Sequence, residues 1–72
     1  MTGHLGYDHS SGRYGLLVSD LFERHFHCGD KLMIEDEGEW TTTTMEMTPD
    51  GEWYLKGTQF KGKSLDGIRA KI

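Results

Sequence analysis

A short sequence repeats almost unchanged after thirteen residues, and it constrains the fold more than any other feature. The first copy is Asp36-Glu37-Gly38-Glu39-Trp40 and the second is Pro49-Asp50-Gly51-Glu52-Trp53. In each copy a glycine-bearing turn precedes an acid and a large aromatic residue, a pattern typical of a tight turn that leads into a new strand. The central region is therefore predicted to be a β-meander. Many unrelated small domains use such turns, so the repeat indicates shape and leaves the chemistry open.

Alternating apolar and polar residues predict further strands on both sides of the meander. With the meander, the chain of 72 residues is expected to form a single domain, residues 1–72. The predicted fold class is mainly all-β: a small antiparallel SH3-like barrel of five to six short strands with at most one or two short helical turns. Its expected core consists of residues that share the inner strand faces: Leu16, Val18, Leu32, Ile34, Trp53, Leu55, Ile68 and Ala70.

Two parts of the chain leave alternatives open. Between Ser19 and Cys28 the two-residue alternation stops, so this segment is either one or two helical turns or an irregular connection. Trp40 presents the second choice, because on a regular strand it lies on the face opposite Met45 and Met47. Either a β-bulge in the threonine run turns all three side chains inward, or Trp40 points outward.

Charge is distributed unevenly along the sequence. The formal net charge is −4, yet residues 30–52 hold eight acids against one base, and residues 56–72 hold five bases against one acid. One interpretation is that the two segments lie on neighbouring strands and neutralise each other. The other is an acidic face that docks on a basic partner, with electrostatics guiding encounter and orientation.

Metal binding and catalysis have weak support in the sequence. The cluster His25-Phe26-His27-Cys28 offers nitrogen and sulfur ligands, but adjacent residues of an extended chain point in opposite directions, and the usual ligand spacings are missing. Cys28 is expected to be a small buried residue. No motif of a hydrolase, phosphate-binding loop or metalloprotease is found. The protein is therefore expected to be no enzyme, with no metal and no cofactor.

Location and nucleic-acid binding follow from composition. One cysteine cannot form an internal disulfide, which fits a reducing cytoplasm, and apolar runs of three residues are too short for a membrane span or signal peptide. Tyr54 and Phe60 near the basic residues of the C-terminal segment suggest a surface for a single-stranded nucleic acid. The overall acidity makes this class less favoured, because nucleic-acid-binding modules are usually basic.

Five stretches resemble a family of short bacterial proteins filed as a domain of unknown function. They are Arg13–Val18, Phe26–Gly29, Gly38–Trp40, Glu52–Leu55 and Leu65–Ile72. The family is common in gut Gram-positive bacteria, often near plasmid, phage or transposon genes. The resemblance implies an accessory protein of a mobile element and brings no catalytic residue with it. Some accessory proteins of such elements inhibit host defence nucleases, and an acidic face suits a protein that imitates DNA.

The function expected from these observations is a small non-catalytic module that binds a protein partner through an acidic face. The bolder version is inhibition of a host defence or DNA-handling protein. A nucleic-acid-binding module and a purely structural domain that pairs with its own copies are the alternatives. The expected partner-binding residues combine steering acids and aromatic anchors: Glu35, Asp36, Glu37, Glu39, Trp40 and Tyr54.

Overall fold

Seven strands and one short 3₁₀ helix make up the computed structural model, which describes all residues from 1 to 72. The elements are β1 (Thr2–Asp8), β2 (Arg13–Val18), β3 (Leu21–His25), β4 (Lys31–Asp36), β5 (Glu39–Met47), β6 (Trp53–Leu55), η1 (Gly62–Leu65) and β7 (Arg69–Lys71). The predicted mainly all-β antiparallel fold and its limited helix content are confirmed. No helix is long and apolar enough to cross a membrane.

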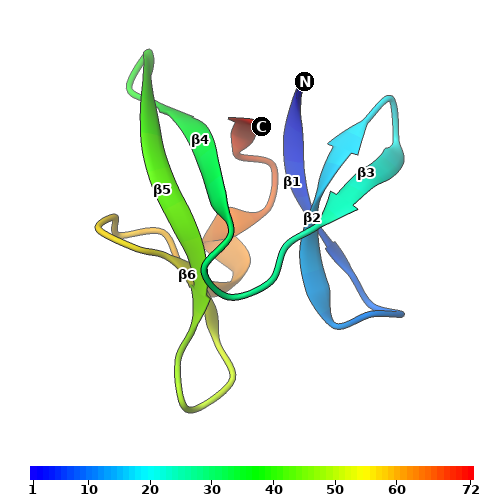
Figure 1. Ribbon diagram of the computed structural model, residues 1–72, viewed down its shortest axis with the longest axis vertical. Helices are drawn as coiled ribbons and strands as arrows, with labels where there is room; N and C mark the ends of the chain where they lie inside the picture. Colours follow the sequence, from blue (N-terminus) through cyan, green and yellow to red (C-terminus); the bar gives the residue numbers. More distant parts are fainter.

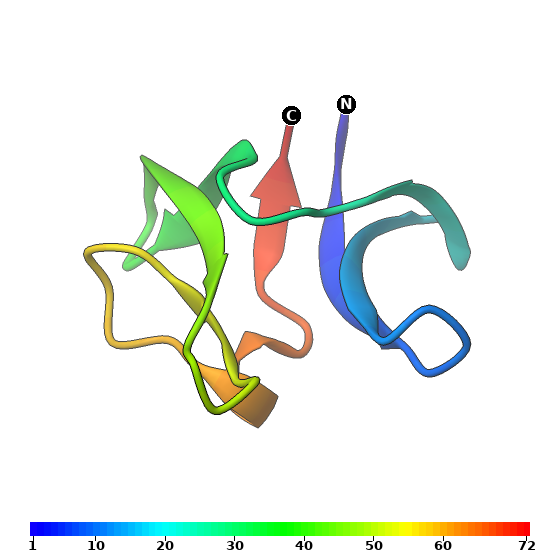
Figure 2. The same ribbon diagram turned by 60° about the horizontal axis from the view of Figure 1, so that its bottom comes forward.

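The strands form one open antiparallel sheet in the order β3-β2-β1-β7-β4-β5-β6. The sheet does not close into the expected barrel, so β3 and β6 remain as its two edges. Figures 1 and 2 show the sheet strongly curled, with β1 and β7 side by side near its centre. One arm of the sheet continues from β1 into β2 and β3, and the other continues from β7 into β4, β5 and β6. The central pair places the two ends of the chain together, and the amide of Ile72 donates to the carbonyl of Met1 at 3.0 Å.

The segment after β2 is a strand, which gives seven strands where five or six were expected. The helical and irregular alternatives for residues 19–28 are both wrong over residues 21–25, which pair with β2, whereas residues 26–28 are irregular. The connecting turn has only two residues, Ser19 and Asp20, with φ of 52° and 66°. Such turns usually contain glycine, so the sequence lacks the common signal. Leu17 pairs with Phe22 and Leu16 with Arg24, which leaves Glu23 as the extra residue of a β-bulge. The bulge explains why the alternation fails there.

The core lies on the concave side of the curled sheet. Of the eight expected core residues, six are buried, whereas Val18 and Ile68 are partly buried and pack against the core. The expectation omitted five further buried residues: Leu5, Tyr14, Phe26, Met45 and Leu65. Phe26 follows β3 directly, and its amide donates to the carbonyl of Tyr14 at 2.8 Å. This bond holds the Phe26 ring inward, where it is completely buried.

Trp40 points outward on the convex side of the sheet. The cross-strand pairs of β4 and β5 follow one another without interruption, from Asp36 opposite Glu39 to Lys31 opposite Thr44. The threonine run therefore contains no bulge. Thr43 and Met45 therefore share the inner face and are buried, while Trp40 is half-buried on the other face. The Thr43 hydroxyl donates to the carbonyl of Lys56 at 2.7 Å, which satisfies this polar group inside the core.

Candidate functional site

The expected acids gather at the free end of the β4–β5 hairpin, at the top of the green arm in Figure 1. Glu35, Glu37 and Glu39 are exposed, and Asp36 is half-buried opposite Glu39. The structure has two close ion pairs, His25–Asp8 at 2.7 Å and His27–Asp30 at 3.7 Å. The hairpin acids therefore have no lysine or arginine partner in contact, and neutralisation by close cross-strand ion pairs is not present.

Trp40 lies next to these acids and contacts the basic C-terminal strand. Glu35 is its cross-strand partner in β4. The Lys71 Nζ atom is 4.2 Å from the centre of the ring, and the Arg69 Cζ atom is 5.9 Å from it. Both cations come from β7, which lies on the other side of β4. Cation–π contacts of this kind contribute about 0.5–1 kcal/mol at exposed sites and hold the ring in place.

Tyr54 does not belong to the same surface. It pairs with Glu46 at the far end of β5, six positions from Trp40. At roughly 3.3 Å per residue the two aromatic side chains are about 20 Å apart along the strand. Tyr54 instead lines a cavity of about 500 Å³ together with Phe60 and Lys61. The structure thus brings together five of the six expected partner-binding residues and leaves Tyr54 apart.

The histidine and cysteine segment does not bring its side chains together into one cluster. No group of three or more His, Cys, Asp or Glu side chains has the arrangement of a metal site. His25 contacts Asp8, whereas the His27 ring lies near Asp30, so the two imidazoles face different partners. Cys28 is exposed, which contradicts its expected burial. Phe26 occupies the inward position of this loop, and Cys28 lies beyond it at the surface.

Asp8 joins a hydroxyl and an imidazole without forming a catalytic relay. Its carboxylate accepts hydrogen bonds from the Ser10 hydroxyl at 2.7 Å and the Ser10 amide at 2.9 Å, and lies 2.7 Å from His25 Nε2. These hydrogen bonds, from Ser10 first and then His25, lower the pKa of Asp8 to about 2. In a serine–histidine relay the imidazole contacts the hydroxyl. Here the Ser10 hydroxyl contacts only the carboxylate, which is a weak base because its pKa is lowered, and the cluster fixes the β1–β2 turn.

The basic C-terminal residues are dispersed over the surface. Arg69 and Lys71 contact Trp40, Lys61 lines the cavity beside Tyr54, and Lys63 lies at a third place on η1. A groove for a single strand needs cations that follow one continuous path. The basic segment is thus divided between the Trp40 ring, the cavity beside Tyr54 and a groove next to η1.

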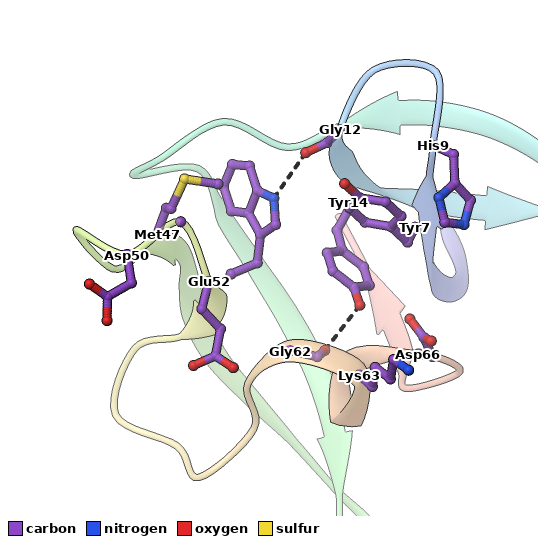
Figure 3. Close-up of a pocket in the computed structure, with 12 residues that line it drawn as sticks. Tyr7, His9, Gly12, Tyr14, Met47, Asp50, Glu52, Gly62, Lys63 and Asp66 are labelled. Atoms are coloured by element: carbon purple, nitrogen blue, oxygen red, sulfur yellow. Dashed lines mark hydrogen bonds between the residues drawn. The ribbon is translucent and has the colours of Figure 1, made fainter.

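A groove of about 650 Å³ is the largest cavity, and sequence reasoning missed it as a unit. It lies between the β1–β2 turn, the β5–β6 turn and η1 (Figure 3), and its twelve lining residues are Tyr7, His9, Gly12, Tyr14, Met47, Asp50, Gly51, Glu52, Trp53, Gly62, Lys63 and Asp66. Two hydrogen bonds fix its floor: Trp53 Nε1–H donates to the carbonyl of Gly12, and the Tyr14 hydroxyl donates to the carbonyl of Gly62, both at 3.0 Å.

The groove has a negative rim. Asp50, Glu52 and Asp66 contribute three carboxylates against the single ammonium group of Lys63. Burial raises the pKa of Tyr14, and the neighbouring Asp66 carboxylate raises it further. The second copy of the repeat places Asp50, Glu52 and Trp53 together in the sequence. The other wall comes from residues about forty positions earlier, and no local pattern indicates that pairing.

Comparisons with known proteins place the chain in a family. Residues 3–72 match the family model described as a domain of unknown function, DUF5348. The crystal structure of a protein from Ruminococcus gnavus superposes with a TM-score of 0.83 at 32% sequence identity, covering 100% of both chains. No protein of curated function matches the chain. The resemblance to a bacterial family of unknown function is thus confirmed, and the chain belongs to the DUF5348 family.

Proposed function

We propose that the protein is a small non-catalytic module that binds a protein partner through the end of its β4–β5 hairpin. The proposed surface consists of Glu35, Asp36, Glu37, Glu39 and Trp40. The observation that carries the proposal is the placement of four carboxylates without a contacting cation beside an outward tryptophan. Carboxylates that lack internal partners are free to pair with a basic surface.

The two kinds of residue have different roles in this proposal. Exposed charges mainly set the rate and orientation of encounter, because water screens them strongly. Tryptophan is enriched among residues that dominate binding energy, since it removes a large apolar area from water. Lys71 and Arg69 restrict the motion of the Trp40 ring through their cation–π contacts. A ring that is fixed before binding loses less conformational entropy when the partner arrives.

The partner that best complements this surface is a basic, DNA-handling protein in the cytoplasm. The sequence resemblance to proteins encoded near mobile elements supports this choice. In its bolder form the module inhibits a host defence protein by presenting carboxylates where DNA phosphates would lie. Pairing between two copies of the chain is the simpler alternative. A nucleic-acid-binding role has one observation in its favour, the presence of Tyr54, Phe60 and Lys61 in one cavity.

Capture of a partner from host lysate by charge-reversed proteins tests the proposal. Glu35→Lys/Glu39→Lys should lose a partner that the unmodified protein retains. Asp20→Lys/Glu23→Lys changes net charge by the same amount on exposed residues of the β2–β3 hairpin, outside both the β4–β5 hairpin and the groove, and it should retain that partner. A partner lost equally from both variants would refute the hairpin as the site.

Two further measurements address the alternatives. A labelled single-stranded oligonucleotide should show no salt-sensitive binding near physiological ionic strength. If it binds, and Lys61→Ala abolishes the binding, the nucleic-acid role replaces the one proposed here. Sedimentation of the protein alone decides whether two copies associate, and a dimer dissociated by Glu35→Lys/Glu39→Lys would make the hairpin a self-association surface.

A further inference from the structure

The groove described above has apolar walls that remain accessible. Tyr7 and Met47 are 38% and 37% exposed, and they are two of the five large apolar side chains exposed anywhere on the molecule. Figure 3 shows Met47 with Asp50 and Glu52 on one side of the groove, and Tyr7, Tyr14 and His9 on the other. An occupant lying between these walls would cover both exposed side chains at once.

The walls are held by contacts that form only in the folded chain. Tyr7 packs edge-on against Tyr14 with ring centres 5.2 Å apart, and His9 packs edge-on against Tyr7 at 4.8 Å. The hydrogen bonds of Trp53 and Tyr14 to Gly12 and Gly62 join the opposite sides across the floor. The groove is therefore formed before any ligand arrives, which lowers the entropic cost of binding.

The charges along the rim select the kind of occupant. Asp50, Glu52 and Asp66 make no close ion pair with a lysine or arginine of the chain. The Trp53 ring already has one guanidinium beside it, since Arg13 Cζ lies 5.8 Å from its centre. An arginine side chain combines an apolar stem with a planar cation that pairs with carboxylates and stacks on aromatic rings. This chemistry matches apolar walls beneath an acidic rim.

We propose that this groove binds an extended, arginine-bearing peptide segment of a partner protein, with arginine stems against Tyr7 and Met47 and guanidinium groups at the rim carboxylates. A peptide fits better than a small molecule, because the groove is open to solvent and flanked by two turns. This site lies at the other end of β5 from the acidic hairpin and does not depend on the function proposed for that hairpin.

Nuclear magnetic resonance provides a direct test, because the chain has two tryptophans and hence two indole N–H signals. Trp53 lies in the groove, whereas Trp40 lies on the convex face and reports separately on binding at the β4–β5 hairpin. The probe is a capped peptide of alternating arginine and alanine, about ten residues long and roughly 33 Å when extended. Titration should shift the Trp53 indole signal, and this shift should persist in Glu35→Lys/Glu39→Lys, in which the acidic hairpin no longer attracts the peptide. Shifts confined to Trp40 would overturn the proposal.

Three comparison ligands test whether the groove recognises positive charge, the guanidinium group and the length of the peptide. A glutamate–alanine peptide should not bind, and a lysine–alanine peptide should bind a few-fold more weakly, because ammonium groups lack the planar fork of guanidinium. Capped single arginine should bind on the order of tenfold or more weakly than the peptide, since it covers fewer contacts. Equal binding of the lysine peptide would overturn the preference for arginine. Equal binding of single arginine would overturn the assignment of a peptide.

Charge-reversed variants separate a specific site from general attraction. Asp50→Lys/Glu52→Lys should weaken binding of the arginine peptide on the order of tenfold or more, because two attractions become repulsions. Asp20→Lys/Glu23→Lys changes the net charge equally on exposed residues outside both proposed surfaces and should weaken binding less than threefold at physiological salt, where distant charges are screened. Equal losses in the two variants would show attraction to net charge alone and would overturn the site.

The apolar walls have their own control. Tyr7→Ala should weaken binding several-fold, whereas Leu21→Ala, which removes a side chain 67% exposed on β3, should have no effect. A circular dichroism melt of each variant confirms that the fold is retained. Unchanged affinity in a folded Tyr7→Ala protein would overturn the role assigned to that wall.

Discussion

The indole N–H of Trp53 donates a hydrogen bond to the carbonyl oxygen of Gly12 at 3.0 Å, joining residues 41 positions apart. Gly12 lies in the β1–β2 turn and Trp53 begins β6, so the bond crosses between two arms of the curled sheet. The Tyr14 hydroxyl reaches the carbonyl of Gly62 in the same region. Two parts of the chain that do not pair with each other in the sheet are thus held together by two aromatic side chains.

Removing the Trp53 donor should destabilise the fold measurably. Trp53→Phe keeps an aromatic ring but leaves the Gly12 carbonyl without its partner, so the free energy of unfolding should fall by about 1–2 kcal/mol. Trp53→Ala should cost about 3–5 kcal/mol, enough to unfold so small a domain. Urea denaturation measures both. Trp40→Phe, on the convex face, is the matched control and should cost less; equal losses at the two tryptophans would contradict the assigned role.

Tyr14 should make stability depend on alkaline pH. Burial, with help from Asp66, raises the pKa of Tyr14 above its ordinary value of 10.0. The folded chain therefore keeps a proton on Tyr14 that the unfolded chain loses. The contribution of Tyr14 to the free energy of unfolding is complete below pH 10 and falls as the pH rises above 10. Urea titrations at pH 8 and pH 11 should show a steeper loss for the unmodified protein than for Tyr14→Phe. Parallel losses would argue against a perturbed Tyr14.

Asp8 should have the opposite effect at acidic pH. Hydrogen bonds from Ser10, and then from His25, lower its pKa from 3.8 to about 2. The folded state therefore holds fewer protons than the unfolded state in this range, so the stabilisation is present above about pH 4 and is lost as the pH falls through 2. Melting temperatures between pH 5 and pH 2 should fall less steeply for Asp8→Asn. An unchanged slope would exclude Asp8 as the source.

Two glycines of β1 should differ in their tolerance of a methyl group. A Cβ at Gly3 would meet the backbone carbonyl of Leu17, whereas one at Gly6 would meet the end of the flexible Leu17 side chain. The side chain has room to rotate, but the backbone moves only if β1 and β2 separate. Gly3→Ala should therefore cost about 1–3 kcal/mol and Gly6→Ala less, as chemical denaturation would measure. The reverse order would contradict the packing of β1 on β2.

Cys28 should react in the folded protein. Its side chain is exposed, so a coloured disulfide reagent should titrate one thiol without denaturant. Addition of urea should increase the reaction rate by less than about tenfold, because no unfolding is needed for access. A thiol that reacts only after unfolding would mean that Cys28 is buried, as the sequence pattern alone suggested.

Elements with strong local signals could be predicted from the residues alone. The repeated glycine turns and two-residue alternation predicted the central meander, and Leu32, Ile34, Leu55 and Ala70 were assigned correctly to the core, because strand periodicity directly selects the inward face. Charge counting also located the acidic hairpin, since its four acids lie within five residues. The partner-binding role of that hairpin stays a prediction.

Features that depend on contacts between distant residues could be identified only in the tertiary structure. The strand at 21–25 forms because it pairs with β2 through a glycine-free turn and a bulge. The turn lacks the usual glycine, and the bulge interrupts the two-residue alternation, so neither signal of a hairpin is present in the sequence. Burial of Phe26 in place of Cys28 depends on how the loop crosses the core. The groove exists because curling of the open sheet brings Tyr7 and Tyr14 opposite Met47 and Trp53. Sequence periodicity reports which face a residue occupies, but only the folded chain determines which faces meet.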